Sequence, residues 1–500
     1  MSRWLEVRGA AREAIVPGAL AGLVGGVAFG AAMVELGVLP TVASLVRTDL
    51  PVVGFVVHMT IAATVGAGLG IILRGRWGAA DILFWGVAYA AFFWFVGPIT
   101  LQPLILGRMP TWDIAAAQAA FPSLLGHVTW GATTGVALIA IKAWRSNEAA
   151  QSVVSLGVQA QTSRTRRRGP VFRGLVAGLV GWGAVGLLAG GSERMLSPLG
   201  NGGGVGATEL GSLTVALVAA VLYALLHPSS APSAGASLVR GAAFGYLLWV
   251  LGGLTILPVL RGAGLNWSIE DAQATFPALP GAILLGAATA LVYHWLGRVA
   301  RLFFSDDVAP QSADSGVWGL RALVRGAAAG LVGGLLFTLV MVQIGLLPTV
   351  ARLVGSDSAL VGLIVHLVIA EVVGASYGLF FRRQAFDPTS AIGWGVSYGF
   401  LWWILGPLTL APVILGAAPA WTLEAATAAF PSLIGHLAYG AALGLTFHAF
   451  EARYSPWWIT RTEAEQTRMA GRRAVATSAG PALWPLLVLV AVTLPVLLAR

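Results

Sequence analysis

Apolar stretches of about 18 residues or more recur along the whole chain and are separated by short polar connections. An apolar α-helix of that length crosses the roughly 30 Å hydrocarbon layer of a bilayer. The ten-residue alternation of polar and apolar residues that marks membrane β-barrels is absent. We therefore expect an all-α, polytopic membrane protein with thirteen helices, at about 17–38, 52–73, 80–98, 120–143, 171–190, 209–227, 239–260, 277–297, 323–346, 359–381, 391–410, 431–450 and 481–499.

A sequence pattern of about 125 residues occurs three times in this chain. AGLVGGVAFG at 21–30 returns as AGLVGGLLFT at 329–338, and FPSLLGHVTWG at 121–131 returns as FPSLIGHLAYG at 430–440. The middle copy diverges more, but GGLTILPVLRG at 252–262 matches the corresponding stretch of the other two. Repetition over a long period fixes the architecture before any single motif is interpreted.

The three copies predict the domain organisation. Each contains four of the expected helices, and an even number of spans returns the chain to the same side of the membrane. The copies are therefore parallel repeats, unlike the inverted repeats of many secondary transporters. We expect four-helix repeats at 1–146 (copy 1), 170–302 (copy 2) and 320–452 (copy 3), followed by one C-terminal transmembrane helix at 479–500.

The composition agrees with a chain that lies mostly in lipid. Hydrophobic residues make up 57% and charged residues 10% of the sequence, and the mean hydropathy is +0.81. That charged fraction is less than half of what soluble proteins carry. The absence of cysteine excludes disulfides, thiolate metal sites, iron–sulfur clusters and thioether-linked haem. It leaves non-covalent haem open.

The positive charges are distributed unevenly. Of the 30 Lys and Arg residues, 24 fall on the side that holds the N-terminus if all thirteen helices cross. Because cytoplasmic loops carry the excess of Lys and Arg, we expect a cytoplasmic N-terminus and an external C-terminus. The basic run TSRTRRR at 162–168 lies on a short linker without interleaved aromatic residues. We expect it to contact anionic lipid headgroups, so the lipid bilayer is the expected partner and nucleic acid is not.

Four histidines occupy matching positions in copies 1 and 3. His58 aligns with His366, and His127 aligns with His436. Each continues a series of small residues at four-residue spacing, which places them on one ridge where a neighbouring backbone comes close. We therefore expect all four imidazoles to face the interior of their bundles. At 1.5 Å per residue, each lies about 10 Å below the outer surface, so the two members of a pair share one depth.

Three interpretations of these pairs remain open. The first is structural, because polar side chains in membranes often hydrogen-bond across a tight helix interface. The second is bis-histidine ligation of a b-type haem by His58 with His127, and by His366 with His436. The third is a role in proton transfer or ligand binding. Copy 2 keeps neither histidine, with Ala282 at the position of His127. A metal-ion site is not expected, because no third ligand lies at the same depth.

Glu371 is predicted near the middle of a transmembrane helix, where an ionised carboxylate costs about 2.5–3.5 kcal/mol. We therefore expect it to be protonated or paired. It lies about 140° around the helix from His366, so the two side chains need not meet. Copy 1 has Ala63 at this position. No pairing of a nucleophile with a base, phosphate-binding loop or carboxylate pair stands out, and an enzyme is not expected.

The connection between the third and fourth helices is the best-preserved segment of each copy. It reads GPxTLxPxxLG in copies 1 and 3, and in all three copies a tryptophan and then Phe-Pro follow. Proline suits the first turn of a helix, and tryptophan suits the membrane interface. The segment is expected either to form a short helix on the outer surface or simply to join two spans.

LIVH at 363–366 and PSLIGHLAYGAALG at 431–444 resemble the YagU-like family of small bacterial inner-membrane proteins, in which one four-helix unit carries both histidines. The resemblance covers copies 1 and 3 well and copy 2 weakly. It implies an integral protein of the bacterial inner membrane with an uncharacterised role. It also directs attention to the four histidines, His58, His127, His366 and His436.

These observations predict a non-enzymatic membrane protein that acts as a scaffold or as a small-molecule-binding subunit. One alternative is a haem b electron carrier that uses the four histidines. The other is a transporter of protons or of a small solute, with Glu371 as its best candidate residue.

Overall fold

The computed structural model describes residues 2–75, 77–110, 112–154, 165–191, 205–228, 233–304, 315–382, 384, 387–453 and 479–499. Within these residues the regular structure is helical and no strand occurs. The predicted all-α class is therefore confirmed. The basic run at 162–168 and the linkers at 146–170, 302–322 and 452–478 lie partly outside the described residues.

Thirteen helices of the described chain are long and apolar enough to cross a membrane, as predicted. Their bounds are Glu13–Glu35, Pro51–Ile72, Ala79–Ile105, Phe121–Arg145, Gly169–Ala189, Glu209–Leu226, Ala234–Leu260, Ala278–Ala300, Gly319–Gln343, Ala359–Phe381, Pro388–Ile414, Phe430–Glu451 and Gly480–Leu498.

The chain divides into two compact units. The first comprises residues 1–169, 247–275 and 488–500. Its helices are α1 (Ser2–Glu35), α2 (Leu39–Ala43), the 3₁₀-helix η1 (Ser44–Val46), α3 (Pro51–Ile72), α4 (Ala79–Trp94), the π-helix η2 (Phe95–Leu101), α5 (Gln102–Ile105), α6 (Ile114–Ala119), α7 (Phe121–Val154), the π-helix η4 (Leu248–Ile256), α12 (Leu257–Leu260), α13 (Ile269–Ala274), the π-helix η7 (Leu489–Thr493) and α24 (Leu494–Leu498).

The second unit comprises residues 170–246 and 276–487. The helices that fall wholly or mostly in it are α8 (Thr165–Ala189), α10 (Val205–Leu226), α11 (Ala234–Leu247), α14 (Ala278–Phe304), α15 (Ser315–Gln343), α16 (Leu347–Ala351), the 3₁₀-helix η5 (Arg352–Val354), α17 (Ala359–Phe381), α18 (Pro388–Leu405), the π-helix η6 (Gly406–Leu410), α19 (Ala411–Ile414), α20 (Leu423–Ala428), α21 (Phe430–Arg453) and α23 (Gly480–Val488).

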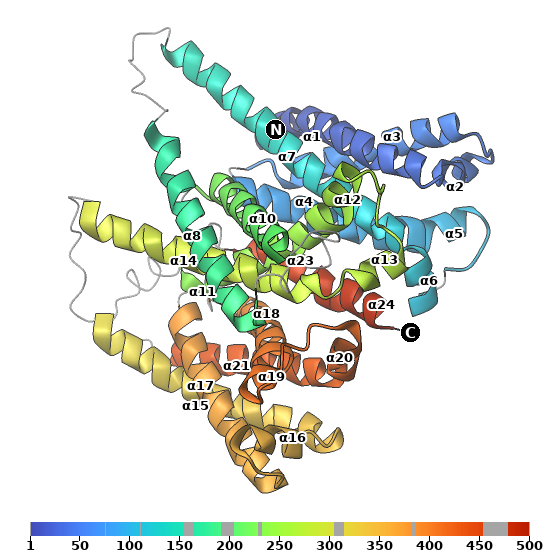
Figure 1. The fold of residues 1–500 in the computed structure, drawn as a ribbon. Helices are drawn as coiled ribbons and strands as arrows, with labels where there is room; N and C mark the ends of the chain where they lie inside the picture. The colour runs from blue at the N-terminus through green and yellow to red at the C-terminus, as the bar shows by residue number, and fades with distance from the viewer. Residues whose placement is uncertain are drawn as a thin grey trace. The chain divides into compact units, whose positions relative to one another are not determined.

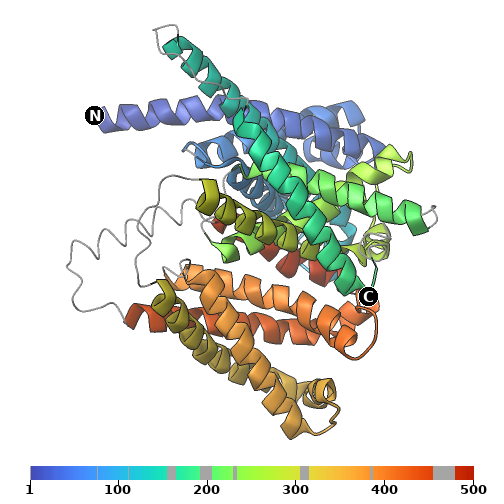
Figure 2. The same ribbon diagram turned by 60° about the vertical axis from the view of Figure 1, so that its left-hand side comes forward.

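Within each unit, helices pack backbone against backbone at their glycines. In the first unit, α1 and α3 lie side by side (Figure 1), and a β-carbon on Gly66 would stand 2.6 Å from both the Gly18 carbonyl oxygen and the Gly22 Cα atom. In the second unit, α15 and α17 pack likewise (Figure 2), and a β-carbon on Gly374 would stand 2.6 Å from the Gly330 Cα atom. The small residues thus form the packing ridges that their spacing predicted.

The third span of copy 1 continues past Pro98, although the sequence predicted its end there. α4 runs into the π-helix η2 and then into α5, so the span covers Ala79–Ile105. Proline lacks an N–H and clashes with the preceding turn, which normally ends or kinks an α-helix. The wider π turn accommodates Pro98, and the Thr100 hydroxyl donates to the Phe95 carbonyl at 2.9 Å. Such local adjustments allow transmembrane helices to contain proline.

The same hydrogen bonds recur at the matching positions of all three copies. A threonine of each π-helix donates to the carbonyl five residues earlier, at 2.9, 3.0 and 2.8 Å. Its hydroxyl also accepts a hydrogen bond from the indole N–H of the tryptophan in the connection that follows, at 3.2, 3.0 and 2.9 Å. The pairs are Trp112 with Thr100, Trp267 with Thr255, and Trp421 with Thr409. This chain of bonds ties the connection to the end of the third span.

A short helix precedes the fourth span of each copy, as one reading of the sequence predicted. These helices are α6, α13 and α20. Each begins at a side chain that accepts a hydrogen bond from the backbone N–H three residues later, which is a standard N-cap. The capping residues are Asp113, Ser268 and Thr422, with distances of 2.8, 3.0 and 3.1 Å.

Candidate functional site

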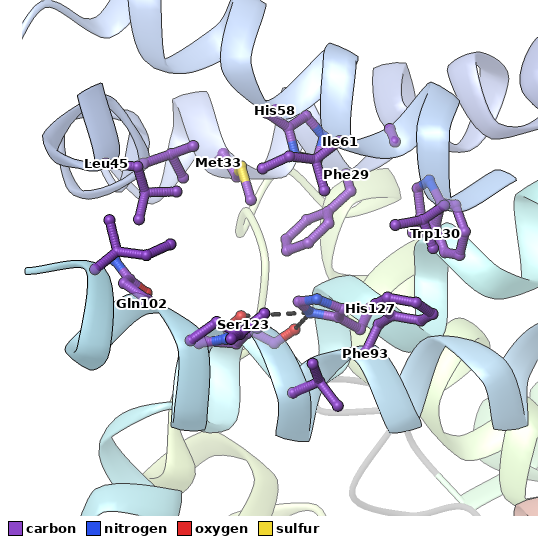
Figure 3. Close-up of a pocket in the computed structure, with 18 residues that line it drawn as sticks. Phe29, Met33, Leu45, His58, Ile61, Phe93, Gln102, Ser123, His127 and Trp130 are labelled. Carbon is purple, nitrogen blue, oxygen red and sulfur yellow. Dashed lines mark hydrogen bonds between the residues drawn. The ribbon is translucent and has the colours of Figure 1, made fainter. Parts of the chain in front are cut away.

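The two histidines of copy 1 lie on either side of one aromatic ring. Phe29 comes from α1, His58 from α3 and His127 from α7. The Phe29 ring centroid is 5.2 Å from that of His58 and 5.3 Å from that of His127, with interplanar angles of 88° and 63°. Figure 3 shows Phe29 between the two imidazoles. These T-shaped contacts set a ring edge against a π face. We call these three residues the copy 1 cluster.

A backbone carbonyl orients each imidazole. His58 Nε2 lies 2.9 Å from the carbonyl oxygen of Gly26 on α1. His127 Nδ1 lies 2.7 Å from the carbonyl oxygen of Ser123, one turn earlier on α7. Because a carbonyl oxygen only accepts, the ring nitrogen at each contact carries the proton. In their neutral forms His58 and His127 are therefore opposite tautomers.

Copy 3 repeats this geometry within the second unit. The Phe337 ring centroid lies 5.1 Å from that of His366 and 4.7 Å from that of His436. His366 Nε2 donates to the Gly334 carbonyl at 3.0 Å, and His436 Nδ1 donates to the Ser432 carbonyl at 2.8 Å. The same tautomers follow.

All four predicted histidines thus lie in two clusters. His58 and His366 are buried, with exposed fractions of 6% and 7%, whereas His127 and His436 are half-buried. The prediction that the imidazoles face the bundle interior is therefore confirmed for His58 and His366. The members of each pair also meet at one level, since both contact the same phenylalanine ring.

The sequence interpretation did not single out Phe29 and Phe337, although a signal was present. The phenylalanine recurs 308 residues later in the chain, and a glycine directly precedes the fourth-span histidine in both copies. In the structure, a β-carbon on Gly126 would overlap the Phe29 ring, and one on Gly435 would overlap the Phe337 ring. These glycines let the aromatic ring reach the imidazole.

Copy 2 has a different pair of residues at this level. Matching the contacts of α8 and α10 to those of α1 and α3 places Trp182 at the position of Gly26 and Ser212 at that of His58. The Trp182 indole N–H donates to Ser212 Oγ at 3.1 Å. A contact between two side chains thus replaces the bond from imidazole to carbonyl.

A cavity of about 300 Å³ opens beside the copy 1 cluster. Its walls come from α1, α3, the π-helix η2 and α7, with further residues from α2, η1, α4 and α5, and most of its lining is aliphatic or aromatic. The polar lining residues include His58, His127, Ser123 and Gln102. In Figure 3, Gln102 lies across the cavity from Phe29. The π-helix η2 supplies part of the lining, and a β-carbon on Gly97 would meet nothing within 4 Å.

The geometry does not fit a haem between the paired imidazoles. Bis-histidine ligation needs one nitrogen of each ring at the iron, on opposite faces of the porphyrin. A phenylalanine ring occupies that space in both copies, so a porphyrin cannot lie between the two imidazoles. Among the described residues, no three His, Asp or Glu side chains gather as metal-ion ligands.

Glu371 lies apart from both clusters. It is exposed on α17, next to Val372, which is 63% exposed, whereas His366 of the same helix is buried. Its carboxylate therefore sits on the outward apolar face and does not meet His366, as the helical angle predicted. Of the two expected states of Glu371, protonated or paired, the paired one is not found within the described part of the chain.

No protein-family model matches the chain, and searches of curated proteins and of solved structures found no similar protein. The resemblance to YagU-like proteins stays a prediction from the histidine motifs.

Proposed function

We propose that this polytopic membrane protein binds a small lipophilic molecule in the copy 1 cavity. The observation that carries the proposal is the cavity of about 300 Å³, whose apolar wall holds two imidazoles of fixed orientation. Pockets for small ligands typically combine an apolar lining with a few placed polar groups. The arrangement of His58 and His127 matches that description.

The imidazoles are arranged for binding rather than for activating a nucleophile. The Ser123 hydroxyl lies 3.4 Å from His127 Nδ1, which resembles a nucleophile beside its base. That nitrogen, however, donates its own proton to the Ser123 carbonyl at 2.7 Å. It therefore has no lone pair to take the hydroxyl proton, so Ser123 and His127 do not form a nucleophile with its base.

The proposed location is the bacterial inner membrane, with the N-terminus in the cytoplasm and the C-terminus outside. The distribution of Lys and Arg supports this orientation, and the resemblance to YagU-like proteins supports the membrane. An odd number of spans then separates the two termini. His58 and His127 lie near the outer ends of their spans in this orientation, so the ligand would bind in the outer leaflet.

Equilibrium dialysis of the full chain in lipid nanodiscs against naphthalene tests this proposal, with empty nanodiscs to subtract partitioning. We expect saturable binding to the wild-type protein. Gly97→Leu should weaken it at least tenfold, because Gly97 lines the cavity and the space around a β-carbon there leaves room for the larger side chain to occupy part of it. Gly183→Leu is the matched control: its β-carbon is equally unobstructed, but it lies in copy 2. Absence of saturable binding, or equal binding by Gly97→Leu, would overturn the proposal.

A further inference from the structure

We infer that the ligand of the copy 1 cavity carries a hydrogen-bond donor, a hydroxyl or an N–H, on an otherwise apolar body. This inference rests on the proposed function and specifies its ligand class. It follows from which nitrogen of each imidazole donates to a backbone carbonyl and which nitrogen keeps a lone pair.

Both imidazole N–H groups of copy 1 are committed to the backbone. His58 donates through Nε2 to the Gly26 carbonyl at 2.9 Å, and His127 donates through Nδ1 to the Ser123 carbonyl at 2.7 Å. A neutral imidazole with one N–H presents a lone pair at its other nitrogen. His58 Nδ1 and His127 Nε2 are therefore acceptors, and no group among the described residues donates to either.

Gln102 adds to this acceptor character on the opposite wall. Its amide nitrogen donates to the Thr41 carbonyl at 3.2 Å. That bond directs the amide nitrogen toward the backbone of α2 and leaves the Gln102 carbonyl oxygen as a further acceptor. His58, His127 and Gln102 thus each present a lone pair at the cavity, beside two donors, the Ser123 hydroxyl and the second N–H of the Gln102 amide.

The remaining lining sets the body of the ligand. Phe29, Met33, Leu45 and Ile61 are apolar and surround the polar positions (Figure 3). A cavity of about 300 Å³ is about twice the engineered apolar cavity of roughly 150 Å³ that accepts benzene. The size suits a fused two-ring system or one ring with a short chain.

A ligand without a donor would leave the free nitrogens of His58 and His127 and the Gln102 carbonyl oxygen without a hydrogen-bond partner. A site built to bond a hydroxyl discriminates strongly against an analogue that lacks it, because the site's own polar groups are then left without partners. We therefore expect a phenol or alcohol to bind at least tenfold more tightly than its methyl ether.

The test compares 2-naphthol with 2-methoxynaphthalene in the same dialysis, at neutral pH, with the full chain in nanodiscs. The two compounds share one apolar body and differ in the single donor proton. We expect 2-naphthol to bind at least tenfold more tightly to the wild-type protein. Equal affinities, or tighter binding of the ether, would overturn the inference while leaving the proposed function intact, provided Gly97→Leu abolishes both.

His127→Phe tests whether the imidazole causes the preference. It keeps a ring of similar shape against Phe29 but removes the acceptor. We expect the ratio of the two affinities to fall at least threefold, because one of the three acceptors is lost, while the ether binds as before. His436→Phe is the matched control in the second unit and should leave the ratio at this site unchanged. Persistence of the full preference in His127→Phe would contradict the assignment. The wild-type comparison decides the inference even if His127→Phe does not fold.

Discussion

The ring of Phe29 lies directly against the backbone of Gly126, so closely that a β-carbon at residue 126 would overlap the ring. Gly126 immediately precedes His127, whose imidazole meets Phe29 with ring centroids 5.3 Å apart. A residue without a side chain therefore sets how near the aromatic ring comes to the imidazole.

Gly126→Ala should displace Phe29 and disturb the cluster. Adding a methyl group to a tightly packed site costs typically about 1–3 kcal/mol, so we expect a lower free energy of unfolding and weaker binding of 2-naphthol. Denaturant-induced unfolding in detergent measures the first effect. Gly183→Ala is the control, because a β-carbon there would meet nothing within 4 Å. Equal stability of the two variants would show that the contact is not tight.

The positions of the spans could be predicted from hydropathy alone. The predicted helix at 359–381 coincides with α17, Ala359–Phe381. The end of the third span could not be predicted, because a sequence rule stops a helix at Pro98. Its continuation depends on a π turn and on a threonine that bonds the carbonyl five residues earlier. The hydrophobic pattern of the sequence carries no signal for this π turn or for the threonine hydrogen bond.

The candidate site was predictable in part. The series of small residues after His58 indicated an inward-facing imidazole, since a ridge of glycines faces a neighbouring helix. Phe29 could not be chosen in the same way. It reaches His127 from a helix about a hundred residues away in sequence, and locally it resembles any apolar residue of a membrane span. The haem hypothesis depended on the empty space that this ring fills.

Thr409 and Trp421 should be energetically coupled. The Thr409 hydroxyl accepts from the Trp421 indole at 2.9 Å and donates to the Ile404 carbonyl at 2.8 Å, and it is fully buried. Thr409→Val should cost about 1 kcal/mol of unfolding free energy, within the range of buried polar contacts in membranes. Trp421→Phe removes the same bond, so the double variant should lose less than the sum of the two single losses.

The corresponding bond in copy 1 provides the comparison for this cycle. Trp112 is 68% exposed and bonds Thr100 at 3.2 Å. Thr100→Val should therefore cost less than Thr409→Val. Strict additivity at Thr409 and Trp421, measured by unfolding of all four proteins under one condition, would show that the indole and the hydroxyl act independently.

Arg47 has an unfavourable backbone conformation that its counterpart avoids. Its φ is 61°, in the left-handed region, and the matching residue of copy 3 is Gly355 with φ 74°. A side chain in that region costs the folded state roughly 1–2 kcal/mol. Glycine avoids this cost, but it loses more conformational entropy on folding, which offsets part of the gain. Arg47→Gly should therefore raise the free energy of unfolding by about 0.5–1 kcal/mol, and Gly355→Arg should lower it. Thermal unfolding of the two variants checks the opposite signs.

Asp387 should make the start of α18 sensitive to pH. Burial alone would raise its pKa, but hydrogen bonds from the Ser390 hydroxyl and backbone N–H, at 2.6 and 2.9 Å, hold the pKa below its ordinary value of 3.8. A carboxyl whose pKa is lower in the folded state stabilises the protein fully above its ordinary pKa. That stabilisation is lost as the pH falls through the folded value.

Two substitutions separate the cap from the charge. Asp387→Ala should cost about 1 kcal/mol at neutral pH, as the loss of an N-cap does. Asp387→Asn keeps an equally good cap without a titrating group. Unfolding midpoints from neutral pH down to pH of about 3 should show the advantage of the wild type over Asp387→Asn shrinking. A constant difference across that range would contradict the role of the Asp387 charge.

Glu371 should destabilise the helix that carries it. It is exposed on the outward face of α17, with no partner among the described residues, and a carboxylate at mid-membrane costs about 2.5–3.5 kcal/mol if ionised. Glu371→Leu should therefore raise the free energy of unfolding in lipid bilayers and leave 2-naphthol binding unchanged. Ala63→Glu makes the reverse change at the matching position of α3 and should lower the free energy of unfolding. Loss of stability in Glu371→Leu would instead mean that the carboxyl group bonds a partner within the membrane.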